Sequence, residues 1–73
     1  MPKLPPLKPR EIEKILQKAG FVFIRQRGSH RIYVKEHLGV TVPFHNKDLR
    51  KGTLQSIIKQ SGLTADEFLT LKK

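Results

Sequence analysis

A short polar segment between two strand-like runs carries the residue types needed for proton transfer next to a phosphate. It reads Arg27-Gly28-Ser29-His30-Arg31. Histidine exchanges protons near neutral pH, and the planar fork of arginine suits phosphate binding. Glycine allows a tight turn or a close approach of a ligand, while a serine hydroxyl both donates and accepts hydrogen bonds. The same residues also suit an ordinary β-turn, so the segment alone leaves both interpretations open.

The chemistry that fits this segment best is cleavage of RNA through its own 2′-hydroxyl. A base must remove the 2′ proton, an acid must protonate the leaving 5′-oxygen, and cations must stabilise the phosphoryl oxygens. His30 is the candidate catalytic residue, as base or acid, and Ser29 is a candidate to hydrogen-bond a phosphate oxygen. Arg27, Gly28 and Arg31 complete the candidate RNA-binding segment. Such a reaction requires no metal ion.

A second basic segment follows the strand-like residues 40–44. His45 opens it, and Lys47, Arg50 and Lys51 add positive charge. All four are candidate RNA-binding residues. His45 would complete an acid–base pair with His30 if the fold brings them together, and otherwise it is a surface histidine that binds phosphate weakly or has no role.

The run from His30 to Lys35 alternates as a strand does. Alternation places Arg31, Tyr33 and Lys35 on one face, and we expect this face to be open to solvent. A base would then stack on Tyr33 between two cations. The alternative is that Tyr33 packs at the edge of the sheet.

The sequence predicts neither a metal site nor a cofactor. Its three histidines, at positions 30, 37 and 45, have few carboxylates between them, and the chain has no cysteine. The absence of cysteine is consistent with a reducing compartment.

Charge gives the strongest indication of the partner. The 73 residues include 15 Lys and Arg against 6 Asp and Glu, a formal net charge of +9. This bias favours a polyanion, with nucleic acid first, an acidic protein second and a membrane surface third, although generic solubility is another explanation. No apolar run is long enough to cross a membrane, and the N-terminus lacks a signal-peptide core. We therefore expect a cytoplasmic protein without a membrane partner.

Apolar periodicity predicts an α+β fold, a two-layer sandwich with the order α-β-β-β-α and a short extra C-terminal helix. Residues 1–9 read as a proline-rich extended leader and residues 10–73 as a single domain. The expected elements are a helix from Pro9 to Ala19, strands from Phe21 to Gln26, His30 to Lys35 and Val40 to Phe44, a helix from Thr53 to Ser61, and a third helix starting at the capping box Thr64–Glu67.

A helix-turn-helix DNA-binding module is the rival interpretation of the C-terminal third. Residues 54–68 contain a helix, a glycine turn and a second helix. The second helix would lead with Asp66 and Glu67, which disfavour contact with phosphate, and three preceding strands also fit this module poorly.

Four segments in order resemble the HicA toxins, the mRNA interferases of HicA–HicB toxin–antitoxin systems. They are Gly20-Phe21 after the first helix, residues 25–33 (RQRGSHRIY), residues 40–45 (VTVPFH) and residues 51–64 (KGTLQSIIKQSGLT). The resemblance covers roughly residues 10–70. It implies a double-stranded-RNA-binding-like fold and metal-independent cleavage of mRNA, with His30 essential and Gly28 and Ser29 as its motif partners. It also implies a HicB-type antitoxin that covers the active site. A non-catalytic RNA-binding domain is the alternative.

Overall fold

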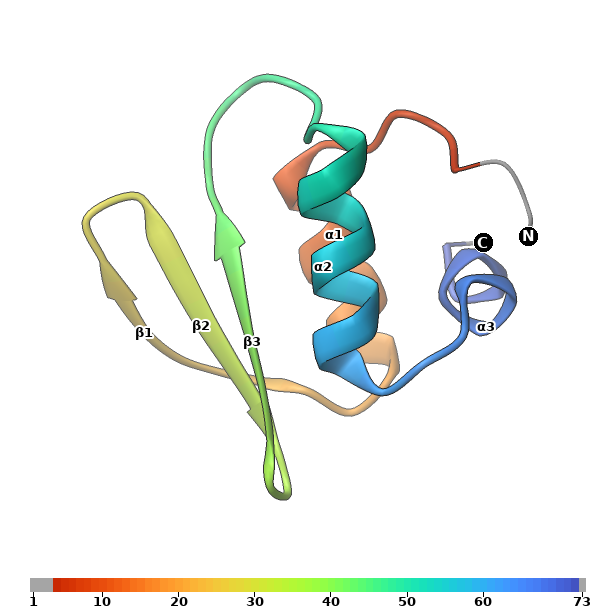
Figure 1. The fold of residues 1–73 in the computed structure, drawn as a ribbon. Coiled ribbons are helices and arrows are strands. Elements are labelled where there is room, and N and C mark those ends of the chain that lie inside the picture. The colour runs from red at the N-terminus through yellow and green to blue at the C-terminus, as the bar shows by residue number, and fades with distance from the viewer. Residues whose placement is uncertain (1–3, 73) are drawn as a thin grey trace.

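The chain forms a three-stranded antiparallel sheet with two helices packed on one face and a third, short helix beyond them (Figure 1). The computed structural model describes residues 4–72. The elements are α1 (Pro9–Lys18), β1 (Val22–Arg27), β2 (His30–Lys35), β3 (Leu38–Pro43), α2 (Lys51–Ser61) and α3 (Ala65–Thr70). The predicted α+β class and α-β-β-β-α order are therefore confirmed, and the arrangement is compatible with a double-stranded-RNA-binding-like fold.

The core lies between the sheet and the two long helices. β2 is the central strand, and its Tyr33 pairs with Val40 of β3. Tyr33, Val40 and Val42 have no exposed surface, so they mark the face that the helices cover. The helices contribute the apolar stripes predicted from their periodicity, Ile12, Ile15 and Leu16 from α1 and Leu54, Ile57 and Ile58 from α2.

The predicted orientation of β2 is wrong. Arg31, Tyr33 and Lys35 face the helices, whereas Ile32 and Val34 lie half-buried on the open face. The simple rule that apolar residues turn inward fails here because the tyrosine carries the larger apolar area, and burying it is more favourable than burying a valine. The two flanking cations are long enough to keep their polar ends hydrogen-bonded at the margins of the covered face.

The proline-rich leader packs more closely than its composition suggests. Leu7 has no exposed surface, and its carbonyl accepts a hydrogen bond of 2.8 Å from the backbone N–H of Leu49. Leu4 packs against the same core. Residues 1–3 of the predicted leader lie outside the described part of the chain. The leader therefore connects the core to the loop that precedes α2.

The bounds of β2 agree with the predicted ones, and the other boundaries differ by at most two residues. β1 begins at Val22, because Phe21 is a buried residue that joins the core before the strand starts. β3 begins at Leu38 after a two-residue turn, and α2 begins at Lys51 rather than Thr53. Gly52 is thus inside the first turn of α2, where its low helix propensity is tolerated.

The third helix begins at the predicted capping box. Thr64 Oγ1 accepts from the N–H of Glu67 at 3.1 Å, and the Glu67 carboxylate accepts from the N–H of Thr64 at 2.9 Å. Phe68 anchors this helix, because its side chain is fully buried. None of the helices described between residues 4 and 72 has the length and apolar character that a membrane crossing requires.

Two glycines of α2 test this packing in opposite directions. Gly62 ends the helix with φ +76°, and an added Cβ would lie 3.3 Å from a Leu38 methyl carbon, so Gly62→Ala should lower the free energy of unfolding by roughly 1 kcal/mol or more. Gly52→Ala meets no atom within 4 Å and should raise it, by up to about 1 kcal/mol. Urea unfolding of both variants measures the difference. Equal effects would contradict the assigned conformations.

Candidate active site on the β1–β2 hairpin

The polar segment forms the two-residue turn of the β1–β2 hairpin. Arg27 pairs with His30, so Gly28 and Ser29 occupy the two central positions. Gly28 has φ +59°, and no atom lies within 4 Å of the place that a Cβ would occupy. The Gln26 side-chain amide donates a hydrogen bond of 2.8 Å to the Gly28 carbonyl. A positive φ at the first central position is the geometry of a type II′ hairpin turn, which favours glycine. The glycine is therefore required by the backbone conformation.

His30 is the first residue of β2, and its side chain is exposed. Its cross-strand partners are Arg27 on β1 and Pro43 on β3. It lies on the open face because it alternates with Ile32 and Val34, so no bend at the glycine is needed to expose it. Within residues 4–72 no hydrogen bond or ion pair holds the imidazole. The ring is thus accessible to a ligand on the open side of the sheet.

The structure brings the two candidate histidines to the same end of the sheet. Pro43 pairs with His30, and the next residue, Phe44, donates its N–H to the Ser29 carbonyl at 2.6 Å. His45 follows directly. His45 is two residues from Pro43 along the chain, and Pro43 is the cross-strand partner of His30. The sum of these Cα–Cα distances puts the Cα atoms of His30 and His45 at most about 13 Å apart. The two histidines therefore lie at the same end of the sheet, and their action as an acid–base pair stays a prediction.

The ring of His45 is oriented by its own loop. Its Nδ1 accepts a hydrogen bond of 3.1 Å from the backbone N–H of Lys47. A nitrogen that accepts carries no proton, so the neutral ring bears its proton on Nε2. An open hollow of about 530 Å³ lies on one side of this residue and another of about 420 Å³ on the other. The first is lined by Lys8, Arg10, Glu11, Phe44, His45 and Asn46.

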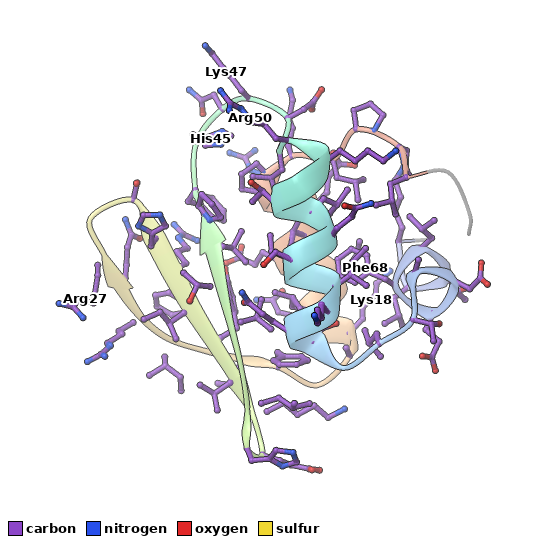
Figure 2. The ribbon with its side chains drawn as sticks, viewed as in Figure 1. Lys18, Arg27, His45, Lys47, Arg50 and Phe68 are labelled. Carbon is purple, nitrogen blue, oxygen red and sulfur yellow. The ribbon has the colours of Figure 1, made fainter. Side chains whose placement is uncertain are left out.

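Exposed cations lie on both sides of this end of the sheet. Arg27 points away from the molecule at the end of β1, and His45, Lys47 and Arg50 belong to the connection from β3 to α2 (Figure 2). Lys51, also exposed, begins α2. Gly28 and Ser29 in the turn before His30 are exposed as well, whereas Arg31, Tyr33 and Lys35 of the predicted RNA-binding set are half-buried or buried.

Arg31 lies beneath the hairpin and joins it to α1. Its Nη1 forms a salt bridge of 3.0 Å with the Glu13 carboxylate, and its Nε donates to the Gln26 side-chain oxygen at 3.1 Å. Its guanidinium carbon lies 3.8 Å from the centroid of the Phe44 ring, a stacking distance. Arg31 therefore contacts the helix, the first strand and the segment after the third strand at once, which is a positioning arrangement.

Tyr33 and Lys35 are also engaged on the covered side. The Tyr33 hydroxyl donates to the same Glu13 oxygen at 2.5 Å, and Lys35 Nζ donates to the Ala19 carbonyl at 2.7 Å. Burial raises the pKa of the Tyr33 hydroxyl well above its usual value, and the hydrogen bond to Glu13 raises it further. The ring is packed edge-on against Phe23, with centroids 5.8 Å apart. The expected base-stacking platform at Tyr33 is therefore wrong, because that ring has no exposed surface.

Three residues of this site lie outside the predicted set. Glu13 receives both Arg31 and Tyr33, Phe44 supplies the stacked ring, and Gln26 bridges Arg31 to the turn. Glu13 lies outside the apolar stripe of α1, so its position suggests only a solvent-exposed acid near a helix start. The sequence pointed to Glu13 only indirectly. The chain has 15 Lys and Arg against 6 Asp and Glu, so each carboxylate is a candidate partner for a cation that folding removes from solvent.

The comparison with protein families assigns the chain. A family model described as "HicA toxin of bacterial toxin-antitoxin" matches residues 9–63. The chain belongs to the HicA toxin family. No curated protein matches the sequence. Membership makes this chain the toxin component of a toxin–antitoxin system, and it replaces the helix-turn-helix interpretation, since the matched residues include the whole sheet.

Among residues 4–72, no three side chains of His, Cys, Asp or Glu come together in a way that could hold a metal ion. The donor set near His30 consists of basic groups instead. The groups that the site of this HicA chain could present to a phosphate ester are thus imidazole rings, cations and backbone amides.

Arg31→Lys tests whether the guanidinium positions the hairpin. Lysine keeps the charge but cannot stack on Phe44 while donating to two separate acceptors. We expect a lower midpoint of urea unfolding and faster exchange of the Phe44 amide proton, which reports the bond to Ser29. Arg27→Lys, an exposed change on the same hairpin, is the control and should alter neither value. Slow exchange at Phe44 in Arg31→Lys would contradict the positioning role.

Proposed function

We propose that this HicA protein is a metal-independent endoribonuclease that cleaves mRNA, with His30 as its catalytic residue. The observation that supports the proposal most directly is the placement of an exposed imidazole on a hairpin held from beneath by Arg31 and from the side by the Ser29–Phe44 hydrogen bond. These contacts hold the backbone that carries the imidazole, while the ring itself stays accessible to a bound substrate for acid–base chemistry.

The reaction uses the 2′-hydroxyl of the RNA as the nucleophile. His30, neutral, takes the 2′ proton as the oxygen attacks the adjacent phosphorus, and the bond from phosphorus to the 5′-oxygen breaks. A proton donor must protonate that leaving oxygen, and His45 is the candidate in its imidazolium form, which donates from Nε2 and becomes neutral. In that form Nδ1 also carries a proton, so the hydrogen bond from the Lys47 N–H is given up. The products are a 2′,3′-cyclic phosphate and a free 5′-hydroxyl, so atoms and charge balance without an added reactant.

The cations around the site bind the phosphates. Arg27 is the cross-strand partner of His30 in the hairpin. Lys47 and Arg50 lie on the connection from β3 to α2 (Figure 2), followed by Lys51 at the start of α2. The last two also flank the first turn of α2, where the helix dipole favours an anion. The turn backbone at Gly28 and the hydroxyl of Ser29 complete a surface that contacts the phosphate closest to the reaction.

The protein partner of this activity is a HicB-type antitoxin, and the compartment is the cytoplasm, where mRNA is found. Family membership implies the antitoxin. A net charge of +9 draws both the RNA and an acidic protein to the chain.

A non-catalytic RNA-binding module is the second candidate, because the same cations would bind RNA without cutting it. Salt dependence does not distinguish the two, since both release counterions.

Replacing His30 by alanine separates these candidates. Long single-stranded RNA is incubated with the purified protein in EDTA and analysed by gel electrophoresis. We expect fragmentation by the wild-type protein and a loss of at least about 100-fold in rate for His30→Ala, because general acid–base catalysis typically contributes 10²–10⁴-fold. His37→Ala is the matched control, an exposed histidine in the turn at the other end of β2. Intact RNA throughout would favour the binding module, and full activity of His30→Ala would remove its catalytic role.

The chemistry of the product ends tests the nucleophile. An RNA oligonucleotide that is cleaved should yield a 2′,3′-cyclic phosphate or its opened monophosphate, read by mass spectrometry. The same oligonucleotide with a single 2′-deoxy sugar on the 5′ side of the scissile bond should resist cleavage there, because the attacking oxygen is absent. Fragments with 5′-phosphates, or cleavage of the deoxy substrate, would show that water attacks instead.

A further inference from the structure

The free edge of the sheet at β1 carries an apolar surface that the proposed chemistry does not use. Three consecutive residues of this strand are exposed: Val22 by 61%, Phe23 by 44% and Ile24 by 54%. They are the large apolar side chains that stand exposed among residues 4–72. Val22 pairs with Val34 of the open face, and Phe23 pairs with Tyr33 of the face that the helices cover, so exposed apolar side chains border this edge on both faces. Single exposed apolar residues are ordinary, but several along one sheet edge indicate an interaction site.

The two edges of the sheet differ in how they are protected. On β3, the Thr41 N–H donates to the Gln60 side chain of α2 at 3.1 Å, and Pro43 ends the strand without an N–H to offer. β1 pairs with β2 alone and lies on the side of the sheet away from α2 (Figure 1). Unpaired backbone groups next to apolar side chains are the features that accept an added strand.

The charge of the strand selects the occupant. Arg25 and Arg27 follow the apolar residues on β1, and both are exposed. A second copy of this chain would bring another +9 to the edge, which opposes association. RNA would make few favourable contacts with Val22 and Ile24, because aliphatic side chains offer no ring on which a base can stack. An extended protein segment with apolar residues next to Asp or Glu complements both halves of the strand.

We propose that β1 is the docking strand for the antitoxin, which adds an acidic β-strand to this edge. The proposal rests on the toxin–antitoxin partnership and does not require the chain to cleave RNA. A bulge between Phe23 and Arg25 leaves Ile24 without a partner on β2, so the added strand pairs with the regular segments on either side of it.

The direction of β1 connects this docking strand to the catalytic end. Its six residues span roughly 20 Å and lead into the turn that holds His30. An added strand that runs the full length of β1 therefore ends beside Arg27, the cross-strand partner of His30. Docking on the apolar half supplies binding energy away from the imidazole, while the acidic half neutralises the arginines that would otherwise hold phosphate.

The test uses the full-length antitoxin encoded with this toxin. Its affinity is measured by calorimetry for the wild-type chain, for the double change Val22→Ser with Ile24→Ser, and for Arg25→Glu. We expect each variant to bind at least tenfold more weakly, because one loses apolar contact area and the other opposes acidic side chains. Lys14→Glu, an exposed charge reversal on α1, is the matched control and should keep nearly wild-type affinity. Unchanged affinity in both β1 variants would overturn the proposal.

Amide hydrogen exchange supplies a second measurement that needs no variant. Added-strand pairing should slow exchange of outward-facing amides between residues 22 and 27 when the antitoxin is bound. Protection confined to other segments would overturn it, as would the same protection produced by RNA alone or by raising the toxin concentration alone. RNA cleavage by the Val22→Ser, Ile24→Ser variant is read in parallel. Loss of antitoxin affinity in that variant supports docking whether or not the wild-type chain proves to be a nuclease.

Discussion

The salt bridge and stacking of Arg31 are the constraint on which the position of the β1–β2 hairpin depends. A guanidinium placed between Glu13 of α1 and the ring of Phe44 fixes three parts of the chain relative to one another. Neither partner is fully exposed, so the contact is less screened than a surface ion pair, and its planar geometry limits the freedom of each part. The β1–β2 hairpin would otherwise extend beyond the helices with only its ladder to hold it, and a histidine at its tip would be poorly placed.

The basic loop after β3 is also held by a few specific contacts. Phe44 bonds to the Ser29 carbonyl at its start, the His45 ring accepts from Lys47 within it, and Leu49 is buried against Leu7 at its end. Each contact restrains the backbone and leaves the charged side chains in solvent. This explains how a loop without regular secondary structure can present cations at fixed positions, as a substrate-binding surface requires.

Much of this fold follows from local patterns in the sequence. Apolar residues at helical spacing located α1 and α2, the capping box located α3, and Gly28 and Gly62 marked the positions where the backbone needs a positive φ. These signals act over a few residues, which is why they can be read without knowing the fold.

The side of the sheet on which β2 turns each residue could not be read in the same way. Arg31, Tyr33 and Lys35 look like a solvated row until Glu13 and the Ala19 carbonyl, 16 to 20 positions away, are brought beneath them. Strand alternation places His30 on the open face, the side opposite to that of Arg31, Tyr33 and Lys35. Partners distant in sequence decided these orientations, and no local pattern encodes them.

The concentration of charge also bears on the stability of the free toxin. A domain of 73 residues has a small core, and a net charge of +9 adds self-repulsion that favours expansion. Arg31 and Lys35 relieve part of this by finding acceptors on α1 and just after it, but Arg25, Arg27, Lys47, Arg50 and Lys51 remain in solvent. Any anion that binds the folded chain therefore stabilises it by mass action, and the relief of this repulsion contributes to its affinity. The charges that suit this protein to bind RNA or an acidic antitoxin thus lower the stability of its free folded state. That state therefore depends on such partners more than it would if its small apolar core carried no excess charge.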